Sequence, residues 1–301
     1  MSDPFAGPPG PRPFRILLDE AMRLSRLHFR SIYWPVAIPI AVVSTLISAA
    51  QAFWFSRFVE DLGRPGAFFS PSVLVVTFAS VLLMMVAYNA MQVAVVDALS
   101  GRPVDMGRAW RFTLQGRALG TLVIWYACPI ASFIACCIPA FYVGPLLAFV
   151  PQAMIEEGRF GTQALSRSAD LTRYNPSRQL GDSPMVKLFL LFLVGIAISY
   201  VLSLLVTLPF QIPMWVDMFR QAASGEEAML ERMPFYMWLQ VPAQFLNALA
   251  STAVYLYLSC GTALLFFDTR GRKEGLDLRT AIDQVFGGPP PSLPLSGDPT
   301  S

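Results

Sequence analysis

The sequence predicts an all-α membrane protein, a polytopic helical bundle of about six transmembrane helices with amphipathic helices at the membrane surface. The first observation behind this fold class is a pattern of charge. Six apolar stretches divide the 301-residue chain, and 18 of its 22 Lys and Arg residues lie in alternate intervals between these stretches. Basic loops stay on the cytoplasmic side during membrane insertion, so this alternation is typical of a multi-spanning protein.

Composition is the second observation. The chain is 54% hydrophobic and only 14% charged, whereas ordinary soluble domains are about 25% charged. A soluble chain of this composition would lack the polar side chains to cover its surface, and a lipid environment removes that need. The net charge of +2 is small, and the basic residues are divided among loops, which argues against a nucleic-acid partner.

The N-terminal part predicts a tail, a surface helix and the first span. Residues 1–13 are rich in Pro and Gly and are expected to be disordered. Residues 14–30 have helical spacing, with the arginines mostly off the apolar face, which predicts an amphipathic helix on the membrane surface. The apolar face is expected to comprise Ile16, Leu17, Ala21, Leu24 and Leu27. The span that follows is too long and begins too late to be a cleaved signal peptide.

The longest uncharged run, 118–155, must turn back on itself. As one straight helix it would measure about 57 Å, nearly twice the hydrocarbon thickness of a bilayer. Pro139, Gly144 and Pro145 mark the expected reversal. The run is therefore divided into a third span and a short fourth span.

The chain is expected to form a single membrane domain, 14–286, followed by a disordered tail, 287–301. Short surface helices are expected in the loop 97–117, anchored by Trp110 and Phe112, and in the polar segment 156–184. The six spans are expected near 33–55, 72–96, 118–138, 141–155, 185–210 and 236–267.

The charge asymmetry predicts the orientation. The opposite side carries only Arg57, Arg64, Arg220 and Arg232. We therefore expect a multi-pass protein of the cytoplasmic (inner) membrane with both termini in the cytoplasm. Anionic lipid headgroups should be attracted to its basic face by about 1 kcal/mol for each well-placed arginine.

Polar side chains inside the spans form the first candidate site. Asn89 and Gln92 share one face of the second span, and Gln240, Gln244 and Asn247 share one face of the sixth. These amides either line a solute path or form hydrogen bonds between helices, worth about 0.6–2 kcal/mol each. A stripe of small residues in the fifth span is expected to allow close helix packing. It comprises Gly195, Ser199, Ser203 and Thr207.

Charged residues at the expected cytoplasmic edge form the second candidate site. They are either a solvated rim that pairs with lipid headgroups or a cluster that joins the loop after the fourth span to the tail. The candidate residues are Glu156, Glu157, Arg167, Asp170, Asp268, Arg270, Arg272, Glu274 and Asp277.

The sequence offers no candidate catalytic or metal-binding set and implies no cofactor. The cysteines lie in apolar runs and read as small packing residues, with redox chemistry at the adjacent pair the alternative. They are Cys128, Cys136, Cys137 and Cys260. The single histidine, His28, lies in the amphipathic segment and is expected to be an interfacial residue.

Three segments resemble the bacterial membrane-domain family named after glycerophosphoryl diester phosphodiesterase. They are ILLDEAMRLSRLHFRSIYWPVAIPI, IPAFYVGPLLAFVPQAMIEEGRFGTQALSRSADLTR and the end of the last span, ALLFFDTRGRKEGLDL. The resemblance covers most of 14–282 and implies a six-helix integral membrane protein, mostly without a defined activity among its members. The chain departs from the family at the polar stretch 175–184. The phosphodiesterase activity itself is not expected, because its barrel uses several histidines and metal-binding carboxylates.

Three function classes remain open from the sequence. The first is a non-enzymatic scaffold or accessory protein in envelope or membrane homeostasis, with a membrane or cytoplasmic protein partner. The second is a transporter or lipid-handling protein that uses the polar faces of spans two and six. The third is an intramembrane enzyme, which we rank last because no catalytic constellation is visible.

Overall fold

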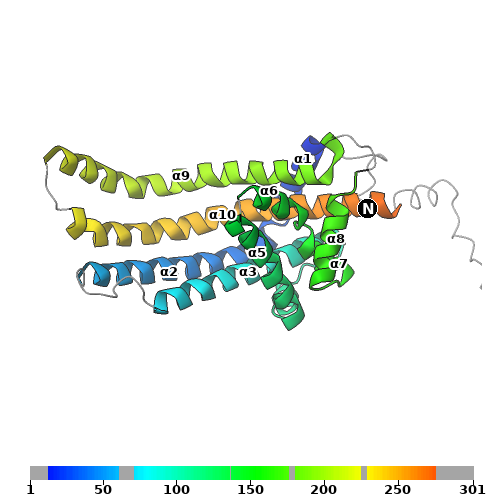
Figure 1. Cartoon of the computed structure of the whole chain (residues 1–301), viewed down its shortest axis with the longest axis horizontal. Helices are drawn as coiled ribbons and strands as arrows, with labels where there is room; N and C mark the ends of the chain where they lie inside the picture. The colour runs from blue at the N-terminus through cyan, green and yellow to red at the C-terminus, as the bar shows by residue number, and fades with distance from the viewer. Residues whose placement is uncertain (1–12, 61–70, 136, 176–179, 225–228, 276–301) are drawn as a thin grey trace, which may run out of the picture.

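The computed structural model describes residues 13–60, 71–135, 137–175, 180–224 and 229–275 of the chain, and the regular elements within these ranges are all helices (Figure 1). The predicted all-α bundle is therefore confirmed. Five of these helices are long and apolar enough to cross a membrane. The tails expected to be disordered lie outside the described residues, apart from Pro13.

Four long helices run alongside one another and form the body of the molecule (Figure 1). They are α2 (Trp34–Glu60), α3 (Pro71–Leu99), α9 (Pro184–Ser224) and α10 (Met229–Glu274). The last of these, α10, packs against the other three. Its 46 residues correspond to about 69 Å of helix. Because a bilayer's hydrocarbon core is only about 30 Å thick, α10 must extend well beyond it.

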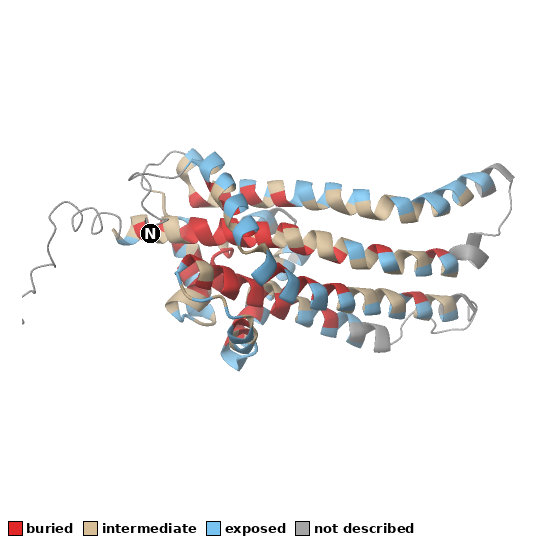
Figure 2. Cartoon of the chain, turned by 180° about the vertical axis from the view of Figure 1, so that it is seen from behind, coloured by how far each residue is buried: buried red, intermediate tan, exposed pale blue. Residues whose placement is uncertain are grey.

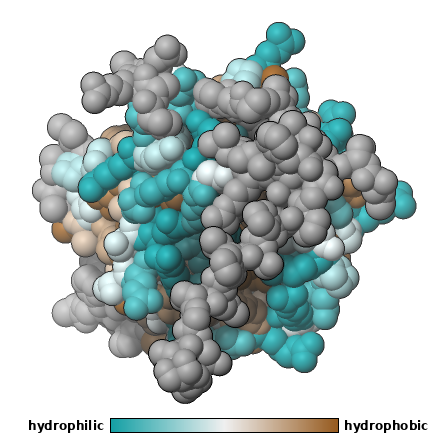
Figure 3. Space-filling model, turned by 90° about the vertical axis from the view of Figure 1, so that its right-hand side faces the viewer, coloured by the Kyte–Doolittle hydropathy of each residue, from teal (hydrophilic) through white to brown (hydrophobic). Residues whose placement is uncertain are grey.

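The shorter helices gather at one end of the bundle, which we call the capped end (Figure 1). They are α1 (Phe14–Leu27), the π-helix η1 (Phe29–Tyr33), α4 (Met106–Thr113), α7 (Val150–Glu157), α8 (Thr162–Thr172) and the 3-10 helix η2 (Leu180–Asp182). Both ends of the described chain lie there, at Pro13 and Gly275. Viewed from this side, hydrophilic residues gather over the face that is not covered in grey (Figure 3).

The expected fourth span, 141–155, is corrected by the structure. It is divided between α6 (Cys137–Leu146) and α7, which have 10 and 8 residues and are too short to cross a bilayer. Five candidate spans, rather than six, are therefore found among the described residues. The physical reason is burial: Val150, Gln152 and Met154 of α7 lie inside the protein, so their segment is apolar because it faces the core.

The third candidate span, α5 (Gly116–Ala135), forms a hairpin with α6 that leaves from the capped end and returns to it. Trp125 Nε1 of α5 donates a 2.8 Å hydrogen bond to the carbonyl oxygen of Leu147, just after α6. Thr121, near the start of α5, accepts a 2.8 Å hydrogen bond from the backbone of Gly161, just before α8. The hairpin thus makes no net crossing, which leaves both ends of the described chain on one side.

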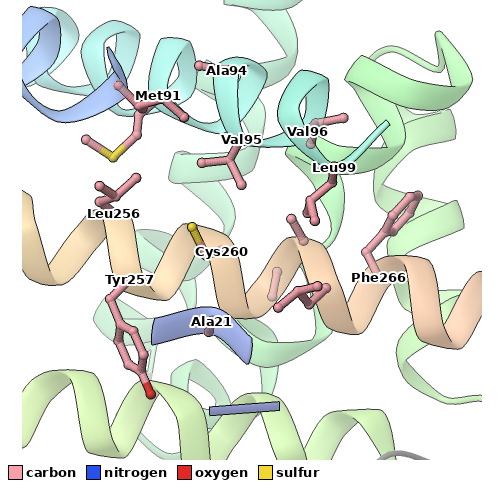
Figure 4. Packing of buried hydrophobic residues seen from close by; sticks show 14 of the residues in the cluster. Ala21, Met91, Ala94, Val95, Val96, Leu99, Leu256, Tyr257, Cys260 and Phe266 are labelled. Carbon is pink, nitrogen blue, oxygen red and sulfur yellow. The ribbon is translucent and has the colours of Figure 1, made fainter. Parts of the chain in front are cut away.

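The hydrophobic core lies at the capped end (Figure 2). Met91 and Val95 of α3 meet Leu256 and Cys260 of α10, and Ala21 of α1 lies on the opposite side of α10 (Figure 4). Toward the far end of the bundle α9 is little buried, since every residue from 196 to 220 is half-buried or exposed. We call this far end the open end.

Close contact between α9 and α10 depends on two glycines. A Cβ on Gly195 would lie 2.6 Å from the Leu258 side chain, and one on Gly261 would lie 2.8 Å from Leu191. The small-residue stripe predicted on α9 therefore allows close packing at Gly195. The other members of that stripe, Ser199, Ser203 and Thr207, are half-buried.

Candidate functional site: ionic networks at the capped end

Arg167 of α8 lies at the centre of the largest ionic network. Its Nε donates to both carboxylate oxygens of Glu157, at 3.0 and 2.8 Å, and its Nη2 donates to Glu157 and to Glu274. The side chains of Arg167 and Glu157 are 9% and 7% exposed. Burial lowers the pKa of Arg167, but its hydrogen bonds to the two glutamates outweigh that effect and hold the pKa above its usual value. The guanidinium thus remains charged and donates hydrogen bonds both to α7 and to the end of α10.

Further charges surround this centre. Arg270 lies 3.1 Å from Glu274 and 3.5 Å from Glu157, and Arg159 lies 3.0 Å from Glu157. Asp170 pairs with Lys273 and lies 3.7 Å from Arg167. The network therefore joins α7, α8 and the last turn of α10, so the sequence-predicted link between loop and tail is present in the structure. We call it the Arg167 network.

Glu156 belongs to a second network, although it is adjacent to Glu157. Arg102 Nη2 lies 2.6 Å from Glu156, and Arg102 Nε lies 2.8 Å from Asp97, whose side chain is fully buried. Arg108 lies 3.6 Å from the same aspartate. Neighbouring residues on a helix point about 100° apart. Glu157 of α7 therefore contacts α8 and α10, whereas Glu156 contacts Arg102, just after the end of α3. We call this group the Asp97 network.

The remaining candidates form a third group around the start of α9. Arg272 donates a 2.7 Å hydrogen bond to Asp268, one turn away on α10. Lys187 of α9 is 1% exposed and interacts electrostatically with both of these residues. Asp277 lies outside the described residues. The eight predicted edge residues that the structure describes are thus distributed over three groups rather than one cluster.

Sequence reasoning missed two basic residues that complete these groups, Arg102 and Lys187. A signal for the first existed in the segment DALSGR, in which an acid and a base flank a Ser-Gly turn. Gly101 has φ of 69° and the Arg102 amide donates to the Asp97 carbonyl, which folds the arginine back onto the aspartate. For Lys187 the only local signal is Asp182, five residues earlier, because its other charged neighbours Asp268 and Arg272 are remote in sequence.

The amides of the second span connect helices. Asn89 Nδ2 donates a 3.0 Å hydrogen bond to Thr113 of α4. Gln152 Nε2 of α7 donates to Gln92 Oε1 at 2.9 Å and to Thr262 of α10 at 3.3 Å. All five side chains are buried, so α3, α4, α7 and α10 are joined by polar contacts inside the capped end.

The amides of the sixth span lie elsewhere. Gln240, Gln244 and Asn247 are half-buried in the open-end part of α10. The ring of Tyr255 in α10 lies 4.0 Å from that of Tyr88, which is adjacent to Asn89 in α3, so Tyr255 is level with the α3 amides. Gln244 lies about 16 Å from Tyr255 along α10. The two predicted polar faces are therefore two separate groups.

Other candidate reactive groups are dispersed in the described part of the chain. It holds no group of three or more His, Cys, Asp or Glu side chains arranged to bind a metal ion. His28 is half-buried at the end of α1, where burial lowers its pKa. Cys260 is buried in the core, Cys128 is half-buried, and both are free thiols. Cys136 lies outside the described residues.

Comparisons of the chain with protein-family models, with curated proteins and with solved structures find no match. The arrangement of ionic and amide groups is therefore the basis for a functional proposal.

Proposed function

We propose that this chain is a non-enzymatic scaffold or accessory protein of the inner membrane, with the capped end and both termini in the cytoplasm. In this proposal the protein serves envelope or membrane homeostasis and presents the capped end to a membrane or cytoplasmic protein partner. The resemblance to the glycerophosphoryl diester phosphodiesterase membrane-domain family belongs to the same proposal, as does the absence of an enzymatic role.

One observation supports this proposal above the others: the buried polar groups of the capped end bind one another across helices. Arg167, Glu157 and Glu274 connect α7, α8 and α10, and Gln152 joins Gln92 to Thr262. Buried polar groups that are paired across helices rigidify a structure, and Arg167 is paired in this way with Glu157 and Glu274. A rigid platform on the membrane is what a scaffold requires, whereas a solute path needs polar groups that remain available.

The cytoplasmic orientation is supported by the distribution of basic residues. Exposed arginines such as Arg111 and Arg117 lie at the capped end, and Arg57 and Arg220 lie at the open end. Matched substitutions Gln115→Cys and Gln221→Cys, in a chain whose native cysteines are replaced, test the orientation. We expect a membrane-impermeant maleimide to label position 221 and not position 115 in intact cells. Labelling of position 115 alone would reverse the proposed orientation.

The scaffold proposal is tested by extracting the protein with its surrounding membrane into native lipid discs and identifying what co-purifies. We expect a stoichiometric protein partner. The double substitution Arg111→Gln and Arg117→Gln should release it, and the matched pair Arg57→Gln and Arg220→Gln at the open end should retain it. Recovery of the chain without a stoichiometric partner, or equal release by both pairs, would contradict the proposal.

A transporter or lipid-handling function is the second candidate, and the open-end amides favour it. Gln240, Gln244 and Asn247 are half-buried and make no side-chain hydrogen bond with another described residue. Replacing all three with alanine separates the two candidates. Loss of a solute or lipid phenotype with unchanged stability favours transport, whereas lower stability without such a phenotype favours a structural role.

A further inference from the structure

A groove of about 560 Å³ lies beside α1 and η1, between them and the adjoining sides of α9 and α10. Ser25, Arg26, Phe29 and Arg30 line it from the N-terminal side. Ile198 of α9 and the stretch 253–257 of α10 supply the opposite wall. The groove is separate from the three ionic groups and from the amides of α3.

The wall of the groove is largely apolar and continues onto the outer surface of the bundle. Val254 and Leu256 form part of it and are 5% and 0% exposed, whereas Ile198 is 38% and Leu27 is 75% exposed. Ile198, Val254 and Leu256 all belong to candidate membrane spans. Because exposed apolar side chains on a span face lipid, the groove opens toward the bilayer.

Two arginines give the groove a basic mouth. Arg26 and Arg30 lie one turn apart, are both exposed, and form no ion pair with another described residue. They differ in this from Arg102, Arg167 and Arg272, which are paired with carboxylates. The two arginines flank Phe29, where the first candidate span begins, so they lie at the membrane boundary. Guanidinium groups bind phosphate oxygens strongly.

We propose that this groove binds one anionic phospholipid, with the lipid phosphate between Arg26 and Arg30 and an acyl chain along Ile198, Ala253 and Val254. The proposal follows from charge complementarity. A phospholipid places an anionic phosphate at the membrane boundary and an apolar acyl chain directly below it. The groove matches this order, with two cationic arginines at its mouth and an apolar wall below them.

This inference rests on the proposed function only in that α1 lies at the membrane surface. It requires neither a protein partner nor the cytoplasmic orientation. Failure of lipid binding and failure of the scaffold proposal are therefore distinguishable, because the first is measured on the purified chain in vesicles and the second on complexes extracted from cells.

The test uses the full chain in vesicles of phosphatidylcholine with a minority of phosphatidylglycerol, followed by native mass spectrometry of the bound lipids. We expect one phosphatidylglycerol to be retained selectively. The double substitution Arg26→Gln and Arg30→Gln should weaken its retention about 25-fold, at about 5-fold for each arginine near the surface. The matched pair Arg15→Gln and Arg23→Gln removes the same charge from exposed positions of α1 outside the groove and should retain the lipid.

Two further variants separate lipid binding from folding. The double substitution Arg26→Lys and Arg30→Lys keeps the charge and should restore most of the retention. Ala253→Trp fills the apolar wall and should release the lipid without changing the charge, and thermal unfolding in pure phosphatidylcholine checks that each variant is folded. Equal retention of phosphatidylcholine and phosphatidylglycerol, or an equal loss in the Arg15 and Arg23 pair, would overturn the proposal.

Discussion

The capped end and the open end are built from the same four long helices, yet their side chains are used differently. Along α10, the part that includes Thr262 and Phe266 is buried almost continuously, whereas the part from Pro234 to Asn247 is mostly half-buried or exposed. Figure 2 shows the same division in the other long helices. Both parts of α10 are apolar, so hydrophobicity at the capped end reflects burial in protein and at the open end reflects contact with lipid.

Polar contacts follow the same division. At the capped end, Arg167 and Gln152 each bind partners from two other helices. At the open end, Tyr236 of α10 donates a hydrogen bond to Asp217 of α9, and the amides Gln240 and Gln244 are not bonded to other described residues. We therefore expect the free energy of unfolding to depend mainly on the capped end.

The largest effect is expected at Arg167. Arg167→Ala leaves the buried Glu157 without its main partner, and breaking a buried pair typically costs about 3–5 kcal/mol. Because Glu274 is a third exposed, we expect about 2–4 kcal/mol here. Unfolding in lipid discs of fixed composition measures it. Arg173→Ala, at an exposed position just after the same helix, is the matched control and should change stability by less than about 0.5 kcal/mol.

A smaller effect is expected where α9 and α10 touch most closely. Gly195→Ala places a methyl group against Leu258, and overpacking of this kind costs about 1–3 kcal/mol. Gly144→Ala in α6 is the control, since a Cβ there meets no atom within 4 Å, and it should be neutral or slightly stabilising. Equal effects at the two glycines would show that α9 is not fixed to α10 at this point.

The sequence predicted the long helices, the amphipathic helix before the first span and the division of charge between the two ends. It did not predict α7, since periodicity and hydropathy do not distinguish a short buried helix from part of a span. Phe149 and Met154 are fully buried, but in the sequence they look like residues that face lipid. The difference lies in tertiary packing, which local hydropathy does not contain.

The candidate sites were predicted in part for a similar reason. A cluster that joins the loop holding Arg167 to the tail holding Glu274 was one of two alternatives, beside a solvated rim, because these charges lie at edges of apolar runs. The different directions of Glu156 and Glu157 follow from helix geometry, but only once α7 is known to be a helix. For the amides, residue type alone left a solute path and interhelical bonding open, and Gln92 and Gln244 show that burial differs between the two faces.

The buried amide chain should contribute less than the ionic network. Gln152→Leu keeps the size of the side chain but removes the donor shared by Gln92 and Thr262. Interhelical hydrogen bonds in membrane proteins are worth about 0.6–2 kcal/mol, and Gln92 would be left buried with this bond lost, so we expect about 1–2 kcal/mol. A double-mutant cycle with Gln92→Leu measures the coupling, and a coupling of zero would mean that the two amides do not act together.

The smallest effect is expected for the same substitution at the open end. Gln244→Leu removes an amide that is half-buried and not bonded to another described residue, so stability should change by less than about 0.5 kcal/mol. The substitution matches Gln152→Leu in chemistry and differs from it in place, so the ratio of the two effects measures how unevenly the bundle is held together. If Gln244→Leu cost as much as Gln152→Leu, the open end would have to contain bound partners for its amides, and those partners would be the first groups to identify.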